Sequence, residues 1–324
     1  MLSRVANSIY WMGRYLERAE NLARMLDVNV LLQLDLPGHT AEQWEPMVMV
    51  TGDDGEFRER YGAATRVNVL DFLVFDTRSP NSILSCIAAA RENARTIREI
   101  LSSEVWEEIN RLHLALRDPG ARDQASQDAH GLFQEIKRAS HLIVGTTSET
   151  MPHGEAWHFS RIGRFLERAD KTSRILDVKY FLLLPSADDV GKPVDDLQWS
   201  ALLRSASALE AYRKVFGRVS ASNVAGFLLF DREFPRSVHR CVSSVQESLH
   251  AITGTPERRF ANPAERSLGR LAADLDYTDV AEVIAGGLHE FVDELQARLN
   301  TVGDDITCTF FAHDATPPKL VIPS

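Results

Sequence analysis

Enzyme signatures and paired cysteines are scarce in this 324-residue chain. The sequence contains no nucleotide-binding P-loop, no dinucleotide-binding glycine motif, no G-x-S-x-G nucleophile elbow and no H-E-x-x-H zinc motif. Its three cysteines form no C-x-x-C pair, which favours a reducing compartment and small, buried thiols; they are Cys86, Cys241 and Cys308. These residue patterns identify no enzyme, and no cofactor is expected.

Basic charge and long apolar runs are also in short supply. The chain carries 36 Lys and Arg against 46 Asp and Glu, a net charge of −10, which disfavours nucleic acid or an anionic membrane as the main partner. No apolar run approaches the ~20 residues of a membrane span. Residues 1–24 mix apolar and charged side chains, unlike a signal peptide. A cytoplasmic location without membrane attachment is therefore expected.

Alternating, strand-like segments are missing as well, whereas helical periodicity extends along the chain. Ser79-Pro80 is expected to provide the N-cap and the first position of one helix. Apolar residues at helical spacing predict long helices over residues 3–34, 81–101, 103–116, 128–144, 155–184 and 279–301. The sequence therefore predicts an all-α fold.

A long internal repeat is the most informative feature that is present. Residues 13–29 and 163–179 are identical at ten of seventeen positions. Residues 68–86 return as 223–241, with nine of nineteen identical. The offset between the copies thus grows from 150 to 155 residues, which fits a longer loop over residues 186–193.

This period, roughly 150 residues, is far longer than the 20–50 residues of solenoid repeats. We therefore expect an internally duplicated helical domain built from two multi-helix repeats related by a pseudo-twofold axis. The first repeat is assigned to residues 1–150 and the second to residues 151–324, with a C-terminal tail from residue 307.

Charged residues of the first helix keep their identity in the second copy. An exposed ion pair contributes only about 0–1 kcal/mol, so a merely solvated face would tolerate exchange. One interpretation is a buried ionic network that sets one repeat in register with the other. The alternative is an anion pocket, because guanidinium groups suit carboxylate and phosphate. The network is favoured, and both interpretations concern the same residues: Arg14, Glu17, Arg18, Arg24, Arg164, Glu167, Arg168 and Arg174.

Asp76 and Asp231 are further candidates, since each ends a Phe-Leu-x-Phe-Asp stretch. They are expected to accept backbone N–H groups of the following helix or to join the arginines of the network. A metal site on these two carboxylates is less favoured, because no His or Cys recurs beside them. The single compact histidine cluster, His153 to His158, fits surface or capping histidines better than metal ligands. No metal site is expected.

These motifs together carry a resemblance to a known family. Glu17-Arg18 and Glu167-Arg168 each lie inside a Gly-Arg-aromatic-Leu-Glu-Arg-Ala stretch, and the similarity continues through residues 75–83 and 89–95. These motifs resemble those of the alpha-E family, bacterial helical proteins named for their Glu-Arg motif. The resemblance extends over nearly the whole length of the chain.

The resemblance implies a biochemical context for the chain, but it provides no catalytic residues. Genes of this family tend to neighbour a circularly permuted ATP-grasp ligase and a transglutaminase-like cysteine peptidase, which implies synthesis or modification of a small peptide or amide-linked metabolite. The chain is therefore expected to be a non-catalytic helical partner of such a ligase. The alternative is an enzyme or ligand-binding subunit whose anion pocket is built from the two Glu-Arg helix faces.

Overall fold

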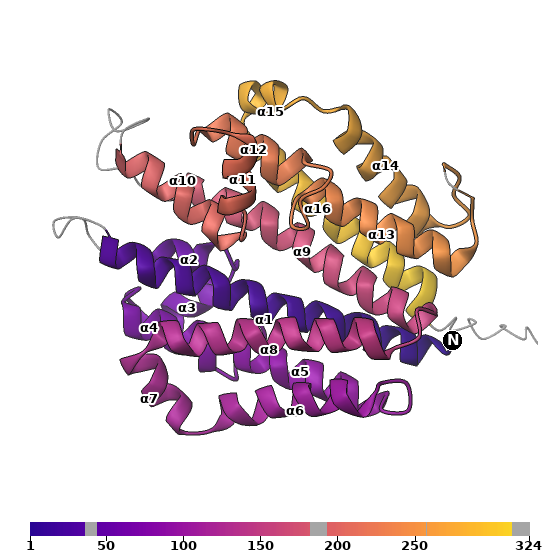
Figure 1. The fold of residues 1–324 in the computed structure, drawn as a ribbon, viewed down its shortest axis with the longest axis horizontal. Coiled ribbons are helices and arrows are strands. Elements are labelled where there is room, and N and C mark those ends of the chain that lie inside the picture. The colour runs from indigo at the N-terminus through magenta and orange to yellow at the C-terminus, as the bar shows by residue number, and fades with distance from the viewer. Residues whose placement is uncertain (36–43, 182–192, 257, 313–324) are drawn as a thin grey trace, which may run out of the picture.

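The computed structural model describes residues 1–35, 44–181, 193–256 and 258–312. Within these ranges the chain is helical and contains no strand, so the predicted all-α fold is confirmed (Figure 1). None of the helices described combines the length and the apolar character that crossing a bilayer requires. Most of the loop expected at 186–193, and the tail beyond residue 312, lie outside the described residues.

Helices follow one another along the chain, with two π-helical turns marked η. The first half of the chain contains α1 (Ser3–Asp35), α2 (Glu45–Met49), α3 (Asp54–Tyr61), α4 (Arg66–Leu70), η1 (Asp71–Phe75), α5 (Ile83–Thr96), α6 (Ser103–Arg117), α7 (Gly120–Gln127) and α8 (Ala129–Thr150). The second half contains α9 (Glu155–Phe181), α10 (Pro193–Ser205), α11 (Leu209–Val215), α12 (Ala221–Phe230), α13 (Val238–Thr253), α14 (Pro263–Tyr277), α15 (Val280–Gly286), α16 (Leu288–Ile306) and η3 (Thr307–Phe311).

Long helices pack in two sets that meet along α1 and α9 (Figure 1). In the first set α5 and α8 pack on α1, and α6 packs on both α5 and α8. In the second set α13 and α16 pack on α9, and α14 packs on both α13 and α16. The most extensive contact between helices joins α1 to α9, and apolar side chains of both sets belong to one continuous buried core.

The two central helices run side by side in the same direction (Figure 1). At their beginnings, the N-terminal amine of Met1 pairs with Glu155, the first residue of α9, at 2.7 Å. Towards their ends, Met25 and Ile175 line the same small cavity. Met25 and Ile175, which are equivalent positions of the sequence repeat, therefore lie on opposite sides of this contact.

Two repeated glycines set how closely α1 and α9 approach. A Cβ atom on Gly13 would lie 2.6 Å from the carbonyl oxygen of Ser160, and one on Gly163 would lie 2.1 Å from that of Tyr10. Both distances are shorter than a carbon–oxygen contact allows, so only glycine permits the backbones to come this near. This close approach brings the charged residues of the repeat within reach of the opposite helix.

Several helix boundaries differ from the sequence-based expectation. Helix α5 is capped by Ser82, whose hydroxyl accepts the N–H of Ser85 at 3.1 Å, so the predicted start at Ser79-Pro80 was wrong because those residues form a turn. The closing helix is divided at Gly287, whose φ of +104° ends α15 before α16 begins. Helix α14 was not predicted, although Asn262 caps it and a proline follows.

Candidate functional site

The two glutamates of the repeated motif are buried between α1 and α9, and each is paired with arginines of the other helix. Glu167, 0% exposed, accepts Arg14 Nε at 2.7 Å and Arg18 Nε at 2.6 Å. Glu17, 3% exposed, accepts Nε and Nη2 of Arg168, both at 2.7 Å. The helix faces that the repeat singled out are thus joined by reciprocal ion pairs.

These carboxylates are held in the ionised form. Burial alone would raise the pKa of Glu17, but the neighbouring guanidinium groups of Arg168 and Arg236 outweigh it and keep that pKa below its ordinary value. Burial likewise opposes ionisation of Glu167, and Arg14 is the strongest of the cations that hold its pKa well below the ordinary value. Neither side chain is therefore poised to exchange protons near neutral pH.

Arg236, in the turn before α13, extends the ionic cluster. Its Nη2 donates to Glu20 at 2.8 Å, and its Nη1 donates to Asn21 at 2.9 Å and to Glu17 at 3.3 Å. Glu20 also accepts a hydrogen bond from Arg24. One guanidinium from the second half thus binds three polar side chains on consecutive turns of α1.

The equivalent place in the first half holds an asparagine, so the two sides of the cluster differ. Asn81 corresponds to Arg236 in the sequence repeat. Its carbonyl oxygen accepts Arg18 Nη1 at 2.8 Å, and its amide donates to Asp53 at 3.1 Å. An amide adds no positive charge. Glu167 pairs with Arg14 and Arg18, and Lys171 Nζ lies 3.5 Å from it, whereas Glu17 pairs with Arg168 and Arg236.

Arg164 corresponds to Arg14 in the sequence repeat, but it does not form the equivalent ion pair with Glu17. Its buried Nε finds no hydrogen-bond acceptor among the residues that the structure describes, and the guanidinium stacks over the ring of Phe165 at 4.9 Å. Burial, reinforced by the positive charge of Arg168, lowers the pKa of Arg164 to about 10. The side chain therefore still carries its charge at neutral pH, and no carboxylate in the described ranges is bound to it.

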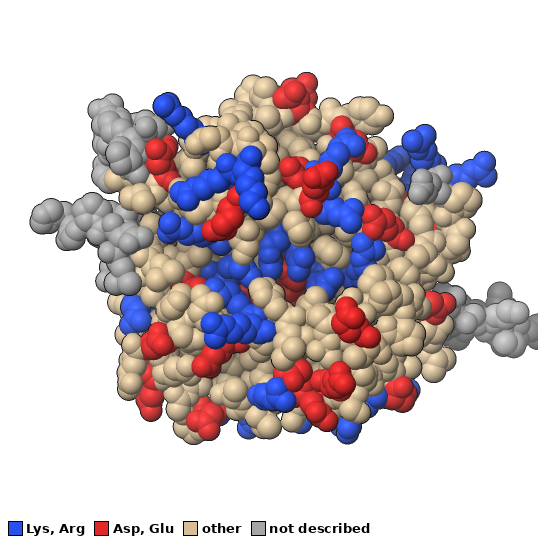
Figure 2. Space-filling model, viewed as in Figure 1, with Lys and Arg blue, Asp and Glu red and all other residues tan. Residues whose placement is uncertain are grey.

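A cavity of about 260 Å³ lies against this arginine. It is lined by α1, α8, α9 and the turn that carries Arg236. Figure 2 shows Lys and Arg atoms gathered across the middle of the face where these helices lie. The lining contains the polar residues Glu17, Glu20, Ser140, His141, Ser160, Arg164, Arg168 and Arg236 together with apolar residues of α1 and α8.

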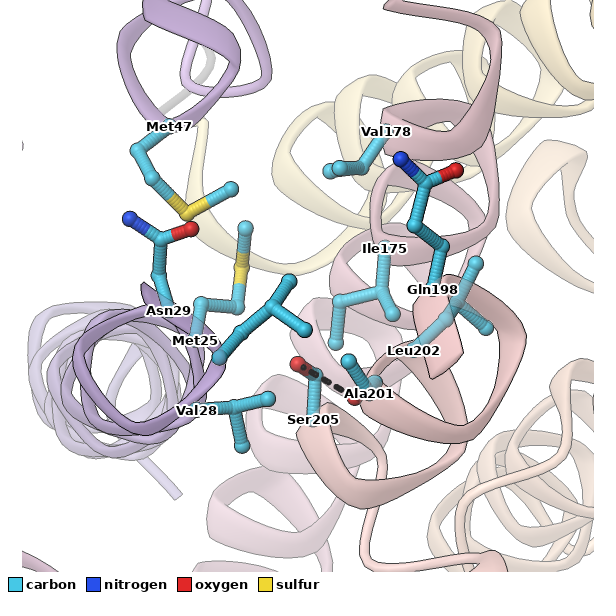
Figure 3. A pocket seen from close by; sticks show the side chains of 11 residues that line it. Met25, Val28, Asn29, Met47, Ile175, Val178, Gln198, Ala201, Leu202 and Ser205 are labelled. Atoms are coloured by element: carbon cyan, nitrogen blue, oxygen red, sulfur yellow. Dashed lines mark hydrogen bonds between the residues drawn. The ribbon is translucent and has the colours of Figure 1, made fainter. Parts of the chain in front are cut away.

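A second cavity, between α1, α2, α9 and α10, is small and mostly apolar (Figure 3). Met25, Val28 and Met47 face Ile175 and Leu202 across it. Its volume of about 30 Å³ offers room for about one water molecule. It is therefore a packing gap at the far end of the α1–α9 contact and no site for an organic ligand.

The remaining candidates lie around or outside the cluster. Arg24 binds Glu20 and Ser207, and Arg174 binds Asp170 at 3.0 Å. The structure does not bring Asp76 or Asp231 to the Glu-Arg cluster.

Both aspartates accept hydrogen bonds from the backbone of turns instead. Asp76 pairs with Arg60 at 2.7 Å and accepts the backbone N–H of Arg78. Asp231 accepts the N–H groups of Glu233 and Phe234. Each carboxylate thus satisfies backbone groups of the turn ahead of α5 or α13, which is why it is not free to reach the arginines of α1 and α9.

The cysteines offer no reactive thiolate at this site. Cys86 and Cys241 are free and fully buried, as predicted, and burial raises the pKa of each to about 12. Cys308 is exposed, outside the cluster. Within the described part of the chain, no group of His, Cys, Asp and Glu is arranged to hold a metal ion.

Sequence reasoning missed several residues of the cluster. Glu20 was passed over because Asp170 replaces it in the second copy, and Arg236 because its counterpart is Asn81. The alignment of Pro80-Asn81-Ser82 with Pro235-Arg236-Ser237 contained a signal, since a charge appears there in one copy alone. Ser140 and His141 lie outside the repeated stretches and had no such signal.

The chain is similar in sequence to several known proteins. The chain is 25% identical to an uncharacterized protein of Mycobacterium bovis and to two of Mycobacterium tuberculosis strains, over 95% of this chain and 37% of each relative. It thus spans little more than a third of the length of these curated relatives. No solved structure matches the chain. Residues 1–311 match a family described as a predicted alpha-helical domain with a conserved ER motif, and the chain therefore belongs to the Alpha-E family.

Proposed function

We propose that this chain is a non-catalytic helical partner of a cytoplasmic ATP-grasp ligase that makes amide or peptide bonds in a small metabolite. The observation that supports it most is the state of the two motif glutamates. Both are buried, ionised and bound to arginines of the opposite helix. A general acid or base works best with a pKa near the operating pH and a reachable proton, so these residues are suited to holding the two halves together.

The ligase partnership rests on the family resemblance and gains support from the length of the curated relatives. In the mycobacterial relatives, the region similar to this chain occupies 37% of a longer polypeptide. An Alpha-E region that is covalently joined to further sequence in these relatives is a reasonable candidate to work together with another protein.

We further infer that residues 1–150 and 151–324 are copies of one duplicated unit. Asp27 of α1 accepts His130 at 2.6 Å, and its counterpart Asp177 of α9 accepts His289 at the same distance. Each histidine is the second residue of its helix, α8 or α16.

A second matched pair supports the duplication. Cys86 Sγ lies 3.7 Å from the carbonyl oxygen of Pro80, as Cys241 Sγ does from that of Pro235. An experimental structure should superpose the two halves by a single rotation near 180°, and unrelated placement of α8 and α16 would refute the duplication.

Co-purification tests the ligase partnership. The tagged chain is expressed with the ATP-grasp ligase encoded beside it, and ATP hydrolysis is measured for the ligase alone, the chain alone and the mixture. We expect a complex that survives gel filtration and a severalfold change in ATP hydrolysis when the chain is added. Separate elution with unchanged hydrolysis would reject the partnership, and turnover by the chain alone would favour an enzyme.

One specific observation favours a second role, that of a ligand-binding subunit. Arg164 carries a charge without a bound carboxylate and borders a cavity. Such a role is compatible with a non-catalytic partner, because a subunit can bind the metabolite that another subunit modifies.

A further inference from the structure

We propose that the cavity between α1, α8 and α9 binds a small organic molecule through one carboxylate or phosphate group, which docks on Arg164. The site deepens the ligand-binding role and does not depend on the ligase. It is formed by residues of both halves, since α1 and α8 supply one side and α9 with Arg236 the other.

The charge of the surroundings selects an anion. Three arginines and two glutamates line the cavity, and two of the three arginines bind those glutamates directly. The excess of one positive charge corresponds to the third arginine, Arg164. The residues concerned are Arg164, Arg168 and Arg236, with Glu17 and Glu20.

Unsatisfied donors point to the same conclusion. Ser140 on α8 and Arg164 on α9 both line the cavity, and the buried atoms Ser140 Oγ and Arg164 Nε have no hydrogen-bond partner in the described parts of the chain. Buried polar atoms in folded proteins are nearly always hydrogen-bonded. An oxyanion accepting from both would satisfy a hydroxyl and a guanidinium at once, and guanidinium–oxyanion bonds are among the stronger ones.

Size and wall chemistry limit the rest of the ligand. At about 260 Å³ the cavity is larger than one of ~150 Å³ that accepts benzene. It is below the ~300–1,000 Å³ of pockets that hold drug-sized ligands. Apolar walls lie beside the charged end and suit a short hydrocarbon or aromatic body; they are Met12, Leu16, Ile143 and Val144.

The site should occur once per chain. On the opposite side of the cluster, Arg14 binds Glu167 at 2.7 Å and the hydroxyl of Tyr10 at 3.1 Å. A Cβ atom on Gly303 would lie 3.4 Å from Arg14 Nη1, so α16 closes over that arginine. We attribute this difference between the two sides to Arg236, which binds Glu17 in the place where Arg164 would otherwise bind.

Calorimetry on the isolated chain tests the proposal with three probes: phenylacetate, inorganic phosphate and the neutral phenylacetamide. We expect saturable binding of phenylacetate or phosphate at one site per chain and none of phenylacetamide. Phenylacetate alone would identify a carboxylate ligand, and phosphate alone a phosphate ligand. No saturable binding of either anion would overturn the proposal.

Variants locate the site. Arg164→Gln should weaken binding about tenfold to a hundredfold, the range of a charged hydrogen bond, and Ser140→Ala should weaken it severalfold. The matched control is Arg161→Gln, one turn earlier on α9, because Arg161 pairs with Glu247 at 2.7 Å and is not part of the cavity wall. Binding that is equally weakened by the control, or unchanged in Arg164→Gln, would refute the assignment.

Thermal unfolding separates binding from folding in the same variants. Arg164→Gln removes a buried charge to which no described carboxylate is bound, so its melting temperature should stay constant or rise. If Arg164 instead had a purely structural role, the melting temperature would fall together with the affinity. Ser140→Ala gives an independent readout if Arg164→Gln does not fold.

Discussion

Arg236 shows how one side chain changes the role of another across the protein. It binds Glu17, Asn21 and Glu20 of α1, where the first half has the neutral Asn81. A carboxylate has room for a limited number of donors. Arg168 and Arg236 are both bound to Glu17, and no carboxylate of the described residues is bound to Arg164. The local sequence around Arg164 closely matches that around Arg14, so this difference originates more than 70 residues away.

At the scale of single residues, we predict that Glu17→Gln and Glu167→Gln destabilise the fold. Either change leaves buried arginine charge uncompensated, and breaking a buried ion pair in this way costs about 3–5 kcal/mol. Urea and thermal unfolding measure the effect. An exposed carboxylate, Glu233→Gln, is the control and should change stability by less than about 1 kcal/mol.

The opposite result is informative too. Unchanged stability of Glu17→Gln, with an altered affinity for phenylacetate or for the ligase, would mean that the carboxylate acts only as part of a pocket wall.

The sequence could predict only part of this chemistry. Identity across the repeat singled out Glu17 and Glu167 and the arginines of their own helices. It could not assign partners, because pairing depends on how close α1 and α9 approach and on which residue precedes α13. Asp76 and Asp231 were expected either to accept backbone N–H groups or to join the arginines of the network. They accept backbone N–H groups, here those of a turn, and sequence spacing alone could not show which donor is nearer.

At the scale of elements, the contact of α1 with α9 depends on Gly13 and Gly163. We predict that Gly13→Ala and Gly163→Ala each destabilise the protein by about 1–3 kcal/mol, the usual cost of overpacking. A Cβ atom would meet a backbone oxygen, which cannot move aside as a flexible side chain can. Circular dichroism during urea unfolding provides the measurement.

Gly145→Ala is the matched control within α8. A Cβ atom on Gly145 would have no neighbouring atom within 4 Å, and alanine favours a helix over glycine by up to about 1 kcal/mol. That variant should therefore be neutral or more stable. Equal stability of all three variants would show that α1 and α9 do not approach as described.

Long helices were predictable and their interruptions were not. The helix expected over residues 103–116 is α6 (Ser103–Arg117), and that over 3–34 is α1 (Ser3–Asp35). Their apolar stripes are long enough to outweigh local preferences. The break at Gly287 and the start at Ser82 depend on one backbone angle and one hydroxyl, and such details leave little trace in a periodic pattern.

At the scale of the whole molecule, four buried carboxylates make the free energy of unfolding depend on pH. Burial opposes ionisation of each, but neighbouring cations prevail and lower the pKa in the folded state, most strongly for Glu20 and Glu167. The group consists of Glu17, Glu20, Glu167 and Asp170. Their ordinary values are 4.5 for glutamate and 3.8 for aspartate, which we take for the unfolded chain.

The sign of the effect follows from proton uptake. Below about pH 4.5 the unfolded chain binds protons on these carboxylates while the folded protein does not, so acid favours unfolding. The stabilisation is complete above that pH and is lost progressively as the pH falls towards the lowered folded-state values. We therefore predict a nearly constant urea midpoint from pH 7 to about 5 and a steep fall below about 4.5.

Glu167→Gln makes the acid prediction specific. Glutamine does not titrate in this range, so the variant should be less stable at pH 7 but should lose less further stability between about pH 5 and 3 than the unsubstituted chain. Urea unfolding at half-unit pH steps measures both curves, with the exposed Glu233→Gln expected to follow the unsubstituted chain. If the two curves stayed parallel for Glu167→Gln, the buried Glu-Arg cluster would not be what couples folding to pH, and carboxylates elsewhere would have to account for it.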